Sequence, residues 1–282
     1  MHIGISMACI NPVDKSRSEA RQQTLELSKE YGLTSIELLL EGVGRLYSPY
    51  PWEFEETELK EIKDFISHFE RKGAHLPIRN MNLIALNERV REDAMEQVRM
   101  ATEIAIELGV DYTVAHASGS TEGWATDREF KRFYHAFKRL ASLCQDKDVI
   151  FTIENIAGLH DMDSCAAMIR LLKEEDLPVA MTIDTGHTNM PLPDNSIPYR
   201  KYGTLSNAVK NFFDLLENVH LHNNYGTPET QHSGLLEGDL KLRTLIEELR
   251  NLDYRGSLTL EVLPRVKDLR NEIETMKRWS GL

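Results

Sequence analysis

VIFTIENIAG (149–158) and VAMTIDTGHTNM (179–190) share one pattern, in which a short apolar run ends in a carboxylate. The first run ends at Glu154 and the second at Asp184. Short, nearly continuous apolar runs of this kind predict strands buried on both faces, and the longer amphipathic stretch between them predicts a helix. The two segments therefore predict a β-α-β unit with parallel strands.

The same rhythm extends over the whole chain. We expect eight strands, at 2–7, 34–40, 74–78, 111–117, 149–154, 179–184, 218–222 and 257–262. Glycines that stop helices are expected at Gly32, Gly73 and Gly109, and aspartates that cap helices at Asp127, Asp163 and Asp239. Eight parallel strands with right-handed crossovers predict a single-domain (β/α)8 TIM barrel over residues 1–282. A doubly wound sheet is the alternative, but it would have to hold eight strands in one long twisted sheet.

Composition restricts the partners and the compartment. The 282 residues carry a net charge of −12, which disfavours nucleic acid. The three cysteines form no C-x-x-C pair, which suits a reducing compartment. We find neither a signal-peptide pattern nor an apolar run long enough for a membrane span, so we expect a cytoplasmic protein without a membrane partner.

Acids and histidines stand where the predicted strands end. In a barrel these ends meet at one rim, where active sites are found. Carboxylates gathered there repel one another and must be neutralised by protons, cationic side chains or a metal. The residues concerned are Glu37, His75, His116, Glu154, Asp184, His220 with His222, and Glu261.

Three segments resemble the metal-binding core of the xylose isomerase-like barrel superfamily. They are residues 149–190, HLHNNYGTPETQHSGLLEGDL (220–240) and SLTLEV (257–262). That superfamily contains sugar isomerases, ketose 3-epimerases, inosose dehydratases and isomerases, dehydroshikimate dehydratases and endonuclease IV. The resemblance implies that Glu154, Asp184, His220 and Glu261 bind one divalent metal ion, with Mn, Zn, Mg and Co as candidates, and that Glu154 and Glu261 are catalytic.

The choice between His220 and His222 stays open, because residues two apart on a strand face the same side. We favour His220 because the family's histidine usually stands three residues before an Asp. Asn223 occupies that place here, which is a departure from the family pattern.

Four further histidines resemble the additional ligands of the endonuclease IV metal cluster, which would allow more than one metal ion. They are His75, His116, His187 and His232. The match is incomplete, because this chain has Thr230 two residues before His232 where that enzyme has an Asp. Histidines at the same rim could instead bind substrate hydroxyls.

We expect a metal-dependent sugar, sugar-phosphate or polyol isomerase or epimerase, in which Glu154 and Glu261 exchange protons through an enediolate. The alternative is an endonuclease IV-like phosphodiesterase acting on abasic DNA, and a third class is a non-catalytic binding protein. Arg79, Trp124 and Tyr225 are predicted to wall the pocket. Residues 191–203 are predicted to form a lid in which Arg200 or Lys201 could meet a phosphate. Barrels of this kind often pair through outer helices or mouth loops, so a homo-oligomer is compatible with the sequence.

Overall fold

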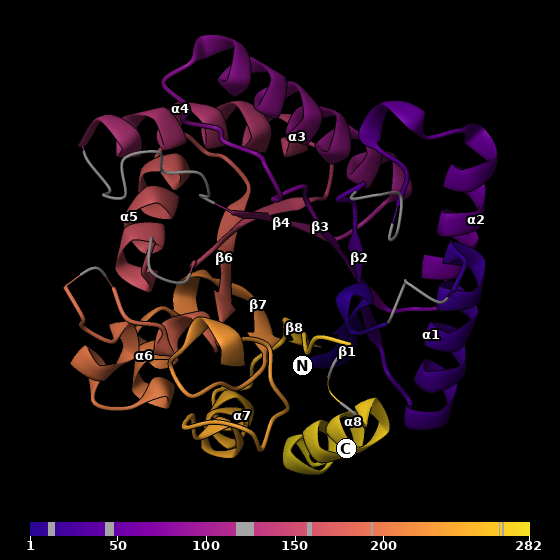
Figure 1. Cartoon of the computed structure of the whole chain (residues 1–282), viewed down its shortest axis with the longest axis vertical. Helices are drawn as coiled ribbons and strands as arrows, with labels where there is room; N and C mark the ends of the chain where they lie inside the picture. Colours follow the sequence, from indigo (N-terminus) through magenta and orange to yellow (C-terminus); the bar gives the residue numbers. More distant parts are fainter. Residues whose placement is uncertain are drawn as a thin grey trace.

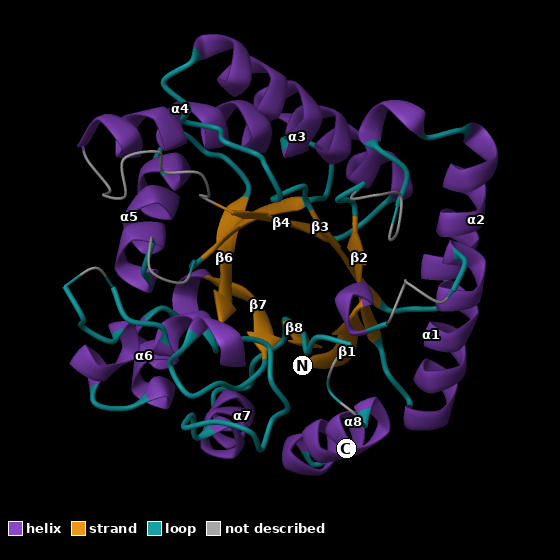
Figure 2. Ribbon diagram, viewed as in Figure 1, coloured by secondary structure: helices purple, strands orange, loops and turns teal. Residues whose placement is uncertain are grey.

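Eight parallel strands close into a barrel in which each strand pairs with its neighbours in sequence and β1 pairs with β8 (Figure 2). The computed structural model describes residues 1–10, 15–42, 48–116, 127–156, 160–192, 194–264, 266 and 268–282. Closure excludes the doubly wound sheet and confirms the predicted TIM barrel. The strands are β1 (His2–Ser6), β2 (Ser35–Leu39), β3 (Arg71–His75), β4 (Tyr112–His116), β5 (Ile150–Glu154), β6 (Val179–Asp184), β7 (Leu216–Leu221) and β8 (Ser257–Leu260).

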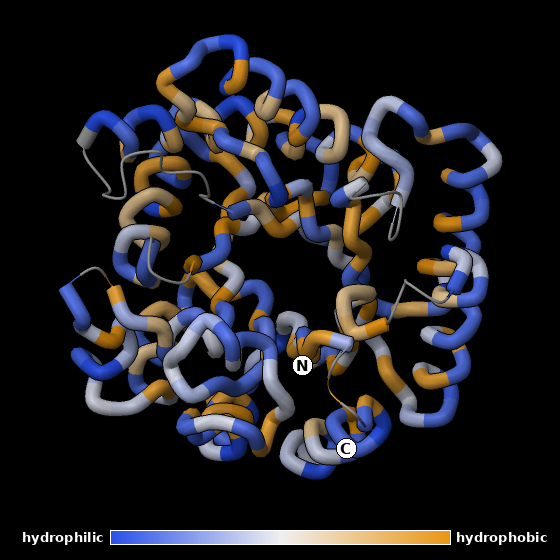
Figure 3. The backbone as a smooth tube through the Cα atoms, viewed as in Figure 1, coloured by the Kyte–Doolittle hydropathy of each residue, from blue (hydrophilic) through white to orange (hydrophobic). Residues whose placement is uncertain are grey.

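Eight α-helices form a ring around this barrel (Figure 1). Hydrophobic residues mark the strands, and hydrophilic residues predominate on the outer faces of the helices (Figure 3). The helices are α1 (Arg17–Tyr31), α2 (Glu56–Ile66), α3 (Glu88–Leu108), α4 (Asp127–Cys144), α5 (Met162–Lys173), α6 (Leu205–Asn211), α7 (Leu242–Asn251) and α8 (Leu269–Ser280). Short 3-10 helices are η1 (Met7–Cys9), η3 (Pro51–Glu53), η4 (His187–Asn189), η5 (Pro198–Tyr202), η6 (Phe213–Leu215) and η7 (Pro228–Thr230). Within the described part of the chain, no helix is both long enough and apolar enough to span a bilayer.

Two predicted helix ends are confirmed and one is wrong. Gly32 and Gly109 end α1 and α3 in the left-handed conformation, with φ of 62° and 73°. Gly73, in contrast, lies inside β3, which begins at Arg71 and not at the predicted residue 74. A side chain at position 73 would come within 2.3 Å of the ring of Tyr112, so this glycine makes room for an aromatic side chain in the barrel centre.

The predicted aspartate caps are wrong at two helices. Asp161, not Asp163, caps α5, where its side chain accepts from the backbone N–H of Ser164. At α7 the N-cap position belongs to Lys241 and not to Asp239. The Asp127 side chain lies outside the described part of the chain.

Candidate metal centre

Four strand ends bring one histidine and three carboxylates together at the barrel mouth. Glu154 ends β5, Asp184 ends β6, His220 lies in β7 and Glu261 directly follows β8. One ligand atom from each residue lies within 4.8 Å of those of the other three, and all four residues are buried. The His220 Nδ1 atom lies 3.1 Å from a Glu261 oxygen, 3.4 Å from Glu154 and 4.0 Å from Asp184.

The hydrogen bonds of His220 suit a metal ligand. Its Nε2 atom lies 2.9 Å from Oε2 of the buried carboxylate Glu37, which accepts its proton. Its Nδ1 atom is buried and has no hydrogen-bond partner among the described residues. An imidazole whose N–H is held by a carboxylate, with the other nitrogen facing three carboxylates, is the arrangement of a metal-bound histidine. The donor set therefore fits a divalent cation. Glu37 holds the His220 ring in place, a role that the sequence did not predict.

His222 is arranged differently. Its Nδ1 atom accepts from the backbone N–H of His232 at 3.0 Å, so its own proton must lie on Nε2. That Nε2–H points at Asp184, 2.9 Å away. The ring has no room to move toward Gly186, because a side chain there would come within 1.8 Å of the His222 ring. His222 thus orients Asp184, whereas His220 turns toward the centre a nitrogen that has no hydrogen-bond partner among the described residues.

Three other rim histidines have their tautomers fixed by backbone carbonyl groups. A carbonyl oxygen can only accept, so each Nδ1 carries a proton, and in the neutral ring Nε2 is the nitrogen with the lone pair. The pairs are His75 with the Leu76 oxygen, His187 with the Asn155 oxygen and His232 with the Glu261 oxygen, each at 2.9 Å.

These histidines form further groups with the spacing of metal ligands. His75, His116 and Glu154 make one such group, in which His116 Nε2 lies 2.8 Å from Glu154. The others are Asp184, His222, His232 and Glu261, and His187, His222 and His232. Thr230 stands where endonuclease IV has an Asp, and it has no carboxylate to offer a metal. Its hydroxyl group hydrogen-bonds within its own loop.

The carboxylates of the centre are ionised. Burial alone would raise the pKa of the Glu154 carboxyl, but the charges of His116 and His220 hold that pKa well below its usual range. Burial also opposes ionisation of Glu261, and His220 nevertheless lowers the pKa of Glu261 to about 2. Both groups are therefore anionic and able to accept a proton at neutral pH.

The histidines divide by their surroundings. Burial alone would lower the pKa of His75 and of His187, but Glu154 raises the pKa of His75, and Asp184 with Glu154 raises that of His187, each to about 9. For His232, burial and the nearby His222 together lower the pKa to about 4. Without a cation the first two hold protons, and a cation bound beside Glu154 and Asp184 would oppose the positive charge of these two histidines.

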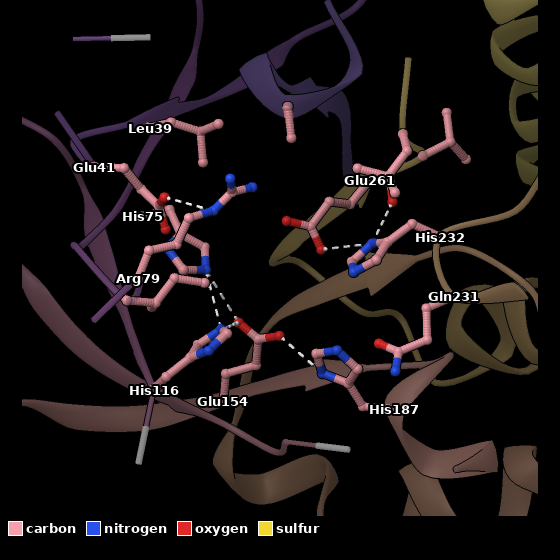
Figure 4. Close-up of a pocket in the computed structure, with 14 residues that line it drawn as sticks. Leu39, Glu41, His75, Arg79, His116, Glu154, His187, Gln231, His232 and Glu261 are labelled. Atoms are coloured by element: carbon pink, nitrogen blue, oxygen red, sulfur yellow. Dashed lines mark hydrogen bonds and ion pairs between the residues drawn. The ribbon is translucent and has the colours of Figure 1, made fainter. Parts of the chain in front are cut away.

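A cavity of about 270 Å³ opens onto the centre (Figure 4). This volume lies just below the range for drug-sized ligand pockets, which starts at about 300 Å³, and it suits a smaller compound the size of a monosaccharide. Glu154 and Glu261 face each other across the cavity (Figure 4). The described lining residues are Ala8, Leu39, Glu41, His75, Ile78, Arg79, His116, Glu154, His187, Gln231, His232, Glu261, Val262 and Leu263.

Of the residues predicted to wall the pocket, Arg79 lines it and Trp124 lies outside the described residues. Tyr225 is 55% exposed and does not line the cavity. No described residue of the predicted lid, 191–203, lines the cavity either. The Lys201 ammonium group pairs instead with Asp161 and Asp163.

Comparison with known proteins places the chain in a family. The sequence pattern of the xylose isomerase-like TIM barrel matches residues 25–279. This chain belongs to the xylose isomerase-like TIM-barrel family. The uncharacterized protein MJ1311 of Methanocaldococcus jannaschii is 23% identical over 274 residues, which are 93% of this chain and 83% of that protein.

Solved structures of the same fold include two related to sugar epimerases. A D-tagatose 3-epimerase-like protein has a TM-score of 0.74 and 20% identity, and covers 99% of this chain and 97% of its own. A D-allulose 3-epimerase from Methylomonas sp. has a TM-score of 0.73 and 18% identity, and covers 99% of this chain and 98% of its own. At these identities the likeness shows the fold alone.

Proposed function

We propose that the protein is a divalent-metal-dependent epimerase or isomerase of a ketose or a related sugar. The observation that carries this proposal is the pair Glu154 and Glu261, two ionised carboxylates that line the same monosaccharide-sized cavity and have ligand atoms within 4.8 Å of each other. The D-tagatose 3-epimerase-like protein and the D-allulose 3-epimerase, which share this fold, support the same reaction class.

The residues proposed to hold the metal are Glu154, Asp184, His220 through Nδ1, and Glu261. Glu37 would fix the His220 tautomer, and His222 would orient Asp184, through the contacts described above. A divalent cation bound there would polarise the substrate carbonyl group as a Lewis acid and make the adjacent C–H more acidic. Oxygen-rich ligands with one imidazole suit Mn, Mg, Co or Zn.

Glu154 and Glu261 would exchange the proton. One carboxylate takes the proton from the carbon beside the carbonyl, and the other returns a proton from the opposite face, which inverts that carbon. The returning carboxyl must first gain a proton. His116 lies 2.8 Å from Glu154 and 3.1 Å from His75, so this row of side chains gives Glu154 a route for proton exchange.

The test is C3 exchange in D2O. Wild-type protein loaded with Mn is incubated with D-fructose, D-tagatose and D-allulose, and NMR follows deuterium at C3 and the C3 epimer. We expect exchange with wild type, a loss of roughly 10²- to 10⁴-fold in Glu154→Gln and Glu261→Gln, and no change in the surface control Glu247→Gln. Full activity in both cavity variants would reject the proton-transfer pair.

A second candidate, cleavage of abasic DNA, is favoured by the group formed by His75, His116 and Glu154. His75, His116 and Glu154 would hold a second cation, which would supply activation of a water molecule for attack on a phosphodiester. Elemental analysis of the purified protein and incision of an abasic duplex test it. Two or more zinc ions per chain together with incision would favour the nuclease, and one ion without incision would favour the epimerase.

A further inference from the structure

Arg79 is the single lysine or arginine among the described residues that line the cavity. It follows β3, and its guanidinium pairs with Glu41, which follows β2. We propose that the cavity selects a sugar with an anionic substituent, a phosphate or a carboxylate, and that Arg79 binds this group. The inference rests on the proposed function, because it names the substrate class of the same site.

The ion pair uses only one side of the guanidinium group. The shortest contact runs from Arg79 Nε to Glu41 Oε2, at 3.3 Å. The terminal nitrogens make no hydrogen bond to any described residue, and the Arg79 side chain is 58% exposed whereas that of Glu41 is 4% exposed. Figure 4 shows the guanidinium reaching from the Glu41 side into the space that Glu261 faces from across the cavity. Glu41 therefore holds the arginine through Nε and leaves the two terminal nitrogens of the guanidinium available for a ligand.

The unused donors define the chemistry of that ligand. A guanidinium has five N–H donors, so about four remain beside Nε–H. Two parallel N–H bonds match the paired oxygens of a carboxylate or phosphate, whereas one sugar hydroxyl would use a single donor. The positive charge of the guanidinium also attracts an anion more strongly than a neutral hydroxyl.

A bound cation would reduce the repulsion between the centre and an anionic substrate. A divalent cation would offset two of the three negative charges of Glu154, Asp184 and Glu261, and Glu41 offsets Arg79. Of the two cations that the sequence offered for a phosphate, Lys201 is paired with Asp161 and Asp163, and Arg200 does not line the cavity. Arg79 is thus the side chain placed to distinguish anionic sugars from neutral ones.

The experiment compares three sugars that differ at C6 only: D-fructose, D-fructose 6-phosphate and D-fructuronate. Calorimetry measures their binding to Mn-loaded wild type, Arg79→Ala and Arg79→Lys, and C3 exchange is followed in parallel. Arg243→Ala, which removes a charge from an exposed pair on α7, is the matched control.

We expect wild type to bind at least one anionic sugar roughly 10- to 100-fold more tightly than D-fructose, the range for a hydrogen bond to a charged group. Arg79→Ala should abolish that preference, Arg79→Lys should retain part of it, and Arg243→Ala should retain all of it. Preference for the phosphate or for the carboxylate identifies the source of the charge.

Two outcomes overturn the inference: D-fructose binding to wild type as tightly as both anionic sugars, or Arg79→Ala weakening all three sugars equally. Arg79-dependent binding without C3 exchange of any sugar would support the anion site and reject the epimerase. C3 exchange without an Arg79-dependent preference would support the epimerase and reject the anion site.

Discussion

Removing the Glu37 carboxylate should weaken metal binding although Glu37 is not a proposed ligand. Its Oε2 atom accepts from His220 Nε2 at 2.9 Å and from the Asn218 side-chain amide at 3.1 Å, in a fully buried position. In Glu37→Leu the His220 ring loses the acceptor that fixes its tautomer and orientation. Loss of such a partner typically costs a metal site about 10- to 100-fold in affinity, which corresponds to about 1.4–2.7 kcal/mol.

Competition titration with a chelating dye measures the Mn or Zn dissociation constant of each variant. Glu37→Gln keeps an acceptor oxygen without the charge, so its loss should be smaller than that of Glu37→Leu. Glu217→Gln is the control. Glu217 is likewise a strand carboxylate with little exposure, but it pairs with Arg71 at the other end of the barrel. Wild-type metal affinity in a folded Glu37→Leu protein would refute the role assigned to Glu37.

Two further predictions concern the same cluster. Gly186→Ala should lower the free energy of unfolding by about 1–3 kcal/mol, as overpacking does, because the new methyl group would clash with the His222 ring. Urea titration measures this change. Wild-type stability of the variant would show that the His222 ring has room to move. For metal-free protein, the protons held by His75 and His187, whose pKa values are raised to about 9, stabilise the folded state below pH 6.5 and cease to do so as the pH rises through 9. For each of the two histidines, the free energy of unfolding should fall by about 1.4 kcal/mol per pH unit between pH 6.5 and 9. The Tm in EDTA should therefore fall from pH 6.5 to 9 while the gain in Tm on adding metal grows, and a rising Tm in EDTA would contradict this assignment.

The strands of the barrel were predictable where they are apolar along their length, as in β5 and β6. The error at β3 has a physical cause. Its first residues, Arg71 and Lys72, are polar, and Arg71 is held by Glu217 from another strand. Gly73 looks like a helix stop in the sequence because its actual reason, the ring of Tyr112 arriving from β4, depends on a contact between strands.

The candidate ligands were predictable because they recur at strand ends, but their individual roles were not. His220 and His222 have the same periodicity, and only their hydrogen bonds separate a free nitrogen from one that accepts a backbone N–H. The Glu41–Arg79 pair joins the loops after two strands, β2 and β3, that pair with each other in the barrel. The spacing of residues along the sequence predicts neither the hydrogen bonds of the two histidines nor the Glu41–Arg79 pair.

The central claim is that Glu154, Asp184, His220 and Glu261 share one cation. A crystal structure of Mn- or Zn-loaded protein, with anomalous scattering at the metal edge, tests it most directly. We predict a peak about 2.0–2.3 Å from one atom of each of the four side chains, with Nδ1 as the His220 ligand. A strong peak elsewhere, or none in crystals grown with saturating metal, would contradict the account.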